Sequence, residues 1–201
     1  MDRPLYISHY SKIENGRISV DGNAIFHTDE AQFFAFIKQA FKNQQIDYSK
    51  FYKMDNLSKL AFLAAEVLLN EEEDKEDIAL VLSNKSASLD TDVKYQGSIQ
   101  DAANFFPSPA VFVYTLANIC GGEIGIRHGM KSEHVFFVSD EFDAVTIFNY
   151  ATYLIKSLKA KKVLCGWVEL FEENYKAVLY LVEERGTALH TTDTINKLVK
   201  N

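Results

Sequence analysis

The stretch that decides the interpretation of this chain covers residues 118–169, and its first part, residues 118–144, reads N-I-C-G-G-E-I-G-I-R-H-G-M-K-S-E-H-V-F-F-V-S-D-E-F-D-A. Its pattern predicts a helix that ends near Gly121 and Gly122, then a turn, and a strand over residues 134–138. A sharp junction at residues 139–141 leads into a second helix, which runs to about Leu158 and is followed by another strand. In an α/β sheet, ligands and catalytic groups gather at such junctions, because the loops after the strands form the crevice.

The composition is that of a globular protein with one sizeable core. The chain has 201 residues, of which 47% are hydrophobic and 24% charged. A net charge of -7 argues against a nucleic-acid partner, because phosphate binding needs clustered Lys and Arg. Cys120 and Cys165 lie in apolar surroundings and suggest no disulfide framework. The sequence shows no signal peptide and no apolar run of membrane-spanning length, so we expect a cytoplasmic protein without a membrane span.

The segments on both sides of this stretch alternate between strand and helix patterns. The run I-A-L-V-L at residues 78–82 is continuously apolar, which is typical of a buried parallel strand. We therefore expect an α/β protein with three α/β/α layers and a mixed, mainly parallel sheet. The other expected elements are strands at residues 5–9, 17–20 and 177–183, helices at 30–42 (capped by Thr28 or Asp29), after Asp55 or Asn56, and at 110–119, and a loop over 86–95.

Several motifs resemble those of the β-ketoacyl-acyl-carrier-protein synthases, the condensing enzymes of the thiolase-like fold. The motifs are the M-D-x-x-S-K-L-A segment at residues 54–61, Pro107, Ser108, Phe112, Thr115, Asn118, Gly121, Gly122, Gly129, the strand at 135–138 and the C-G-W-V-E segment at 165–169. The resemblance covers nearly the whole chain but only the N-terminal half of the family's enzyme. It implies a single ketosynthase N-terminal-like domain over residues 1–201, with a core over 1–185 and a polar tail or short helix over 186–201.

The position that matches the family's nucleophilic cysteine is Glu141. In similar enzymes a helix N-terminus lowers the pKa of the thiol, and the thiolate attacks an acyl thioester. A carboxylate is a poor acyl acceptor, and the half that carries the family's two catalytic histidines lies outside the resemblance. We therefore expect no condensation by this chain alone. A purely structural interpretation makes the segment a helix cap, in which Asp140 accepts backbone N–H groups and Asp143 completes a capping-box-like pair.

The resemblance also implies a dimer that forms through one strand, whose residues are His134, Val135, Phe136, Phe137 and Val138. We expect a homodimer or a heterodimer with a full-length ketosynthase, with an acyl carrier protein as a further candidate partner. The implied role is that of a non-catalytic accessory protein in carrier-protein-dependent fatty-acid, aryl-polyene or polyketide-type biosynthesis.

Two other functions stay open from the residues. In one, Glu141 or Asp140 is the general base of a small acyl-thioester hydrolase or decarboxylase. In the other, the Phe-rich segment at residues 33–41 lines a pocket for an acyl chain, although a helix packed in the core explains the same pattern. The five histidines show no metal-ligand spacing, and the acidic run at residues 71–77 is typical of a surface that faces water. We expect neither a metal nor a cofactor.

Overall fold

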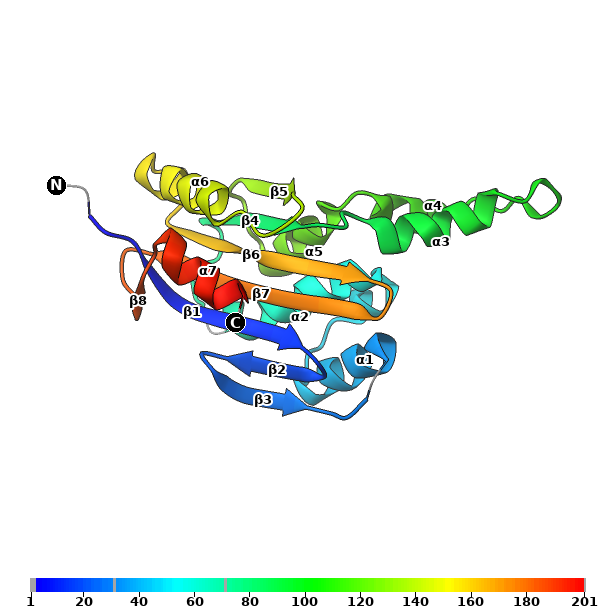
Figure 1. The fold of residues 1–201 in the computed structure, drawn as a ribbon, viewed down its shortest axis with the longest axis horizontal. Helices are drawn as coiled ribbons and strands as arrows, with labels where there is room; N and C mark the ends of the chain where they lie inside the picture. Colours follow the sequence, from blue (N-terminus) through cyan, green and yellow to red (C-terminus); the bar gives the residue numbers. More distant parts are fainter. Residues whose placement is uncertain (1–2, 31, 71, 201) are drawn as a thin grey trace.

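The fold is known from a computed structural model, which describes residues 3–30, 32–70 and 72–200. These residues form one mixed sheet of eight strands in the order β3-β2-β1-β7-β6-β4-β5, with β8 paired to β1 (Figure 1). The strands are β1 (Tyr6–Glu14), β2 (Arg17–Val20), β3 (Asn23–His27), β4 (Ile78–Asn84), β5 (His134–Val138), β6 (Lys162–Phe171), β7 (Asn174–Glu183) and β8 (Ala188–Leu189).

Helices cover both faces of this sheet. The helices are α1 (Phe33–Asn43), α2 (Asn56–Leu69), α3 (Leu89–Ile99), α4 (Pro109–Phe112), α5 (Ile119–His128), α6 (Ala144–Lys156) and α7 (Thr192–Lys200), with 3₁₀ turns η1 (Ser49–Lys53), η2 (Ala102–Asn104) and η3 (Val113–Thr115). One hydrophobic cluster lies between the sheet and α1, α2 and α5, and a second between the sheet and α6 and α7. The three-layer α/β/α architecture is therefore confirmed.

The sheet is mixed, as expected, but the expectation that it is mainly parallel is wrong. The parallel pairings among the described strands are those of β4 with β5 on one side and with β6 on the other, and every other described pairing is antiparallel. The reason is the number of tight hairpins. Asn15 and Gly16, and then Asp21 and Gly22, all have positive φ, which is the conformation of the turns that join adjacent antiparallel strands. All seven residues of β4 are buried, as expected for a parallel strand covered on both faces.

The predicted helix ending at Gly121 and Gly122 is wrong, because both glycines lie inside α5. This helix begins at Ile119 and ends at His128, followed by Gly129 with φ 67°. A Cβ atom on Gly121 would lie 2.9 Å from Leu80 Cδ2 of β4, so the glycine lets the helix pack closely on the sheet. The continuous helix expected at residues 110–119 is broken into α4 and η3, and the loop expected at 86–95 contains the first turns of α3.

The two long helices next to the sheet differ in how they begin. Asp55 caps α2 as predicted, and its side chain accepts a hydrogen bond from the backbone N–H of Ser58 at 2.9 Å. Neither Thr28 nor Asp29 caps α1. That helix begins at Phe33, whose backbone N–H donates to Oε2 of Glu173 at 2.7 Å.

The C-terminal segment packs against the core rather than away from it. Residues 193–199, where a short helix was one expectation, lie within α7, and Ile195 and Val199 are buried in the second hydrophobic cluster. Within the described residues, no single helix is long and apolar enough to cross a membrane. One helix pair, residues 109–115 with 119–128, passes a length and composition test together but is bent by 100°.

Candidate functional site

The junction after β5 places its acidic residues differently from the sequence expectation. The N-cap of α6 is Asp143, whose Oδ1 accepts the backbone N–H groups of Val145 at 3.0 Å and Thr146 at 3.1 Å. Hydrogen bonds from the Thr146 side chain and backbone lower the pKa of Asp143. The expected cap at Asp140 is therefore wrong.

Glu141 lies before the helix rather than at its first turn. Its side chain is 82% exposed, and its Oε2 is 3.8 Å from Lys200 Nζ at the end of α7. The next residue, Phe142, points the other way and packs edge-on against Trp167, with 6.1 Å between the ring centroids. A shallow depression of about 390 Å³ surrounds the junction. A general base that works near neutral pH needs a buried carboxylate, and Glu141 does not have that burial.

The two cysteines offer no alternative nucleophile. Both Cys120 and Cys165 are fully buried, and burial raises the pKa of each thiol well above its usual range. A thiolate is the reactive form, so both side chains behave as small core residues. In residues 3–30, 32–70 and 72–200, no group of three or more His, Cys, Asp or Glu side chains is arranged to hold a metal ion.

The strand predicted as the dimer interface, β5, lies at an edge of the sheet (Figure 1). It pairs with β4 from Leu80↔His134 to Asn84↔Val138. The backbone N–H of Ser139 donates to the Asn84 carbonyl at 3.0 Å. Because alternate residues of a strand face the same neighbour, the N–H groups of residues 134, 136 and 138 point away from β4. The outer side of β5 therefore presents backbone donors and acceptors that pair with no other strand among the residues that the structure describes.

The side chains of β5 are divided between the two layers. Phe136 packs against the cluster under α5, whereas Val135 and Phe137 pack against the cluster under α6. Val138 is 58% exposed at the end of the strand. His134 lies over Gly125, where a Cβ atom would come within 2.3 Å of its ring, and partial burial lowers the pKa of His134. Gly125 thus fixes how closely α5 and β5 approach.

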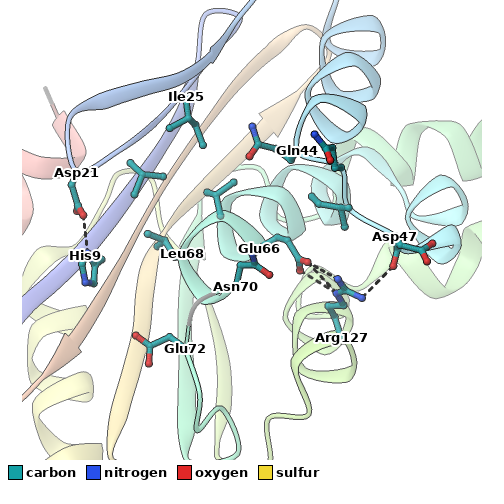
Figure 2. A pocket seen from close by; sticks show the side chains of 14 residues that line it. His9, Asp21, Ile25, Gln44, Asp47, Glu66, Leu68, Asn70, Glu72 and Arg127 are labelled. Carbon is teal, nitrogen blue, oxygen red and sulfur yellow. Dashed lines mark hydrogen bonds and ion pairs between the residues drawn. The ribbon is translucent and has the colours of Figure 1, made fainter.

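Figure 2 shows a polar cavity of about 660 Å³ between the β1–β3 hairpins and the ends of α1, α2 and α5. Glu66 is a buried charged group in its wall, 4% exposed, and accepts hydrogen bonds from Nε and Nη2 of Arg127 at 3.2 and 2.6 Å. Nε2 of His128 lies 3.1 Å from Glu66. Burial by itself raises the pKa of Glu66, but His128 and Arg127 outweigh it and lower the pKa to about 2.

Sequence reasoning did not find this cluster. The signal that could have revealed it is Glu66, the single charged residue inside the apolar run A-F-L-A-A-E-V-L-L at residues 61–69. A charge on a buried helix face needs a partner of opposite charge, so this residue predicts an ion pair. Both carboxylate oxygens of Glu66 face residues of α5, so the side chain joins α2 to α5. The chemistry of the cluster is that of a structural ion pair.

The Phe-rich helix α1 belongs to the core. Phe33, Phe36 and Phe41 are buried, and Phe41 stacks on Phe51 with 3.9 Å between the ring centroids. Phe34 is the exposed one, and Lys38 lies over its ring at 3.8 Å. The aromatic side chains of α1 therefore pack mainly in the core, which agrees with the core-helix interpretation rather than with a pocket for an acyl chain.

Comparison by sequence finds no matching protein-family model and no matching curated protein. Comparison by structure finds ketosynthases. The ishigamide ketosynthase/chain length factor matches with a TM-score of 0.65 and 20% identity over 90% of this chain and 62% of that chain. The ketosynthase ApeO in complex with its chain length factor ApeC, from Xenorhabdus doucetiae, matches with a TM-score of 0.61 and 16% identity. That match covers 92% of this chain and 80% of that chain.

A third match is AntDE:AntF, a type II polyketide synthase acyl-carrier protein in complex with its ketosynthase. Its TM-score is 0.61 with 15% identity, over 92% of this chain and 64% of that chain. This chain thus spans less than two thirds of the matched chains in the first and third structures. The mixed sheet with helices on both faces thus matches these structures over at least 90% of this chain. The chain therefore has the thiolase-like fold of the ketosynthases, as its motifs implied.

Proposed function

We propose that this protein is a non-catalytic, ketosynthase-like accessory subunit that pairs through β5 with a second chain of the same fold. That chain is either another copy of the protein or a catalytically active 3-oxoacyl-carrier-protein synthase. The observation that carries the proposal is the free, apolar edge at β5. An exposed strand edge is a template for pairing, and proteins otherwise protect it with charges, proline or a covering segment. Residues 135–138 contain neither charge nor proline.

The non-catalytic part of the proposal depends on Glu141. The sequence resemblance matches it to the position of the family's nucleophile, but its side chain is exposed and faces Lys200 instead of a closed pocket. A carboxylate in water attacks thioesters poorly, and both thiols of the chain are buried. The geometry favours neither the hydrolase nor the decarboxylase alternative.

The comparisons support the pathway only by analogy. Two of the matched structures pair a ketosynthase with a chain length factor, and the third binds an acyl carrier protein. We propose a corresponding role in carrier-protein-dependent fatty-acid, aryl-polyene or polyketide-type biosynthesis. We also propose that residues 1–201 act as one ketosynthase N-terminal-like domain.

The test is the state of association of edge variants, measured by analytical ultracentrifugation with the candidate ketosynthase present or absent. Val138→Lys places a charge on the exposed end of β5, where it is tolerated by the fold but opposes pairing. Val135→Asp makes the same change nearer the middle of the strand. Leu158→Asp, at a 92% exposed position far from β5 in the sequence, is the matched control.

We expect both β5 variants to dissociate the complex and the control to leave it intact. Circular dichroism would show that Val138→Lys remains folded. Undiminished association of a folded Val138→Lys and Val135→Asp would contradict pairing through β5. Thioester turnover that is lost in Glu141→Ala would contradict the non-catalytic role.

A further inference from the structure

A groove of about 370 Å³ lies between β1, β8 and α7, on the face of the sheet that α7 covers. In Figure 1, α7 lies in front of β7 and β1, and β8 pairs with the first residues of β1. Three strands, β7, β6 and β4, separate β1 from the edge strand β5. The described residues that line the groove include none from the junction at residues 139–143. The groove is therefore distinct from both features on which the proposed function depends.

A bulge in β1 directs the side chains that form the floor of the groove. The register of β1 against β7 shifts between Ile7 and Tyr10, where two residues of β1 lie opposite one residue of β7. Residues three apart in a regular strand face opposite sides of a sheet. Because of the extra residue, Ile7 and Tyr10 face the same side, and both pack against the cluster under α6 and α7. Bulges that redirect a side chain in this way are over-represented beside functional sites.

The wall opposite α7 is the segment that leads into β8. A Cβ atom on Gly186 would collide with the carbonyl oxygen of Ile7, so the glycine lets this segment lie directly against β1. The backbone N–H of Thr187 donates to the same carbonyl at 2.9 Å, and Ala188 is the register partner of Ile7. Backbone contacts thus set the position of this wall, so the groove does not depend on side-chain rotamers alone.

Two lysines and no acidic side chain line the groove, among the residues that the structure describes. This lining contrasts with the net charge of -7 for the whole chain. Lys12 is 17% exposed, and its Nζ lies 3.5 Å from Oε1 of Glu14, which is longer than a hydrogen bond. The other oxygen of Glu14 lies 3.3 Å from Nζ of Lys176. Lys197 is exposed on α7. Both lining ammonium groups therefore keep N–H donors for an anion.

The rest of the lining is mostly apolar. Ile7 comes from β1, Ala188 from β8 and Leu198 from α7, and the ring of Tyr10 adds to them. Ligand sites in proteins combine apolar walls with a small number of placed polar groups. The groove has both parts, because three elements supply its carbon surface and two of those elements supply its ammonium groups.

We propose that this groove binds a small organic carboxylate. The apolar body of the ligand lies on Ile7, Ala188 and Leu198, and its carboxylate accepts hydrogen bonds from Lys12 and Lys197. An inorganic anion would leave the apolar surface unused, and an uncharged hydrocarbon would leave the ammonium groups without a partner. The proposal goes beyond pairing through β5 and does not depend on it, because the groove and that edge lie at different places on the sheet.

The experiment is a titration of the full chain with hexanoate, followed through the backbone amide signals in proton–nitrogen NMR spectra. We expect saturable binding, with the shifts concentrated in residues 7–12 and 187–198. Acetate lacks most of the apolar body, and hexanol lacks the charge. Each should bind at least about tenfold more weakly than hexanoate, because each loses one of the two kinds of contact.

Three variants of the groove and one control localise the binding. Lys12→Met and Lys197→Met keep the side-chain stem and remove the ammonium group, and each should weaken hexanoate binding by about tenfold. Ala188→Phe fills the groove and should abolish binding. Lys42→Met, at an exposed position in the last turn of α1 on the other face of the sheet, should bind as the wild type does. Lys197 is exposed, so its replacement preserves the fold and keeps the test decisive.

Several results would overturn the proposal. Hexanoate that does not saturate, or that shifts amides elsewhere in the chain, would do so. Hexanol that binds as tightly as hexanoate would show that the lysines contribute nothing, and acetate that binds as tightly would show the same for the apolar floor. Wild-type affinity in a folded Lys197→Met and Ala188→Phe would also overturn it. Pairing through β5 stands or falls separately, because it is measured by association rather than by hexanoate binding.

Discussion

Replacing Glu66 by Gln tests whether one buried ion pair holds α2 to α5. In the wild type, Glu66 is 4% exposed and accepts hydrogen bonds from two nitrogens of Arg127, and His128 lies beside it. The pKa of this carboxyl is lowered from 4.5 to about 2, although burial alone would raise it. At about 1.4 kcal/mol for each pKa unit, the ionised form gains about 3 kcal/mol from the fold. Glutamine keeps the shape and an acceptor but loses that charge.

We expect Glu66→Gln to lower the free energy of unfolding by about 2–3 kcal/mol at neutral pH, measured by urea denaturation. The sign of the pH dependence follows from the lowered pKa. Stabilisation by the carboxylate is complete above the unfolded-state pKa of 4.5 and disappears as the pH falls through about 2. The difference between wild type and variant therefore shrinks between those two values.

Glu76→Gln is the matched control, because Glu76 pairs with Lys131 at 2.7 Å but both side chains are more than 60% exposed. An exposed pair of this kind contributes less than about 1 kcal/mol. If Glu66→Gln costs no more than Glu76→Gln, or if its cost is the same at about pH 3 as at neutral pH, the reasoning about the buried pair is refuted.

Three further predictions concern the junction, the start of α1 and the thiols. Asp143→Ala should lower the free energy of unfolding by about 0.5–2 kcal/mol in urea denaturation, because it removes the cap of α6. Glu141→Ala should change the free energy of unfolding by less than about 0.5 kcal/mol. Equal losses in the two variants would contradict the assignment of the cap. Glu173→Gln should cost about 1 kcal/mol by the same measurement, because its carboxylate accepts the first backbone N–H of α1, and an unchanged value would show that water replaces it. Cys120 and Cys165 should react with a thiol reagent only as fast as the protein unfolds, since burial raises the pKa of both, and a rapid phase in native buffer would disprove this.

The elements that the sequence predicted well carry strong local signals. The buried strand β4 is a continuous apolar run, and α2 has a capping residue followed by an apolar stripe. The start of α1 could not be predicted in the same way, because its first N–H is satisfied by Glu173, which lies 140 residues away in the chain.

The errors come from tertiary packing. Gly121 and Gly122 suggested the end of a helix, but both lie inside α5, where Leu80 occupies the space that a side chain at Gly121 would need. Nothing in a single sequence separates a glycine that turns the chain from one that lets two elements approach. Helix α3 was missed because its apolar side chains are exposed, so it has no buried stripe to set the period.

The candidate site was predicted in part. The strand His134–Val138 was placed correctly, but its edge position depends on the crossovers from β4 to β5 and from β5 to β6, which put β4 between the other two strands. The sequence also placed Glu141 at the junction after this strand, but it did not predict that the side chain is exposed. The exposure follows from Phe142, which anchors the junction in the core and directs the neighbouring side chain outward. That the strand forms an interface stays a prediction.

The most direct test of pairing is hydrogen–deuterium exchange at β5 itself, on the assembled protein and after dilution or removal of the ketosynthase partner. Pairing through β5 predicts slow exchange at the outward N–H groups of residues 134, 136 and 138 in the assembly, and fast exchange when the assembly dissociates or when Val138 is replaced by Lys. The same rate at these groups in every state would show that the edge of β5 remains unpaired, and would contradict the proposed function.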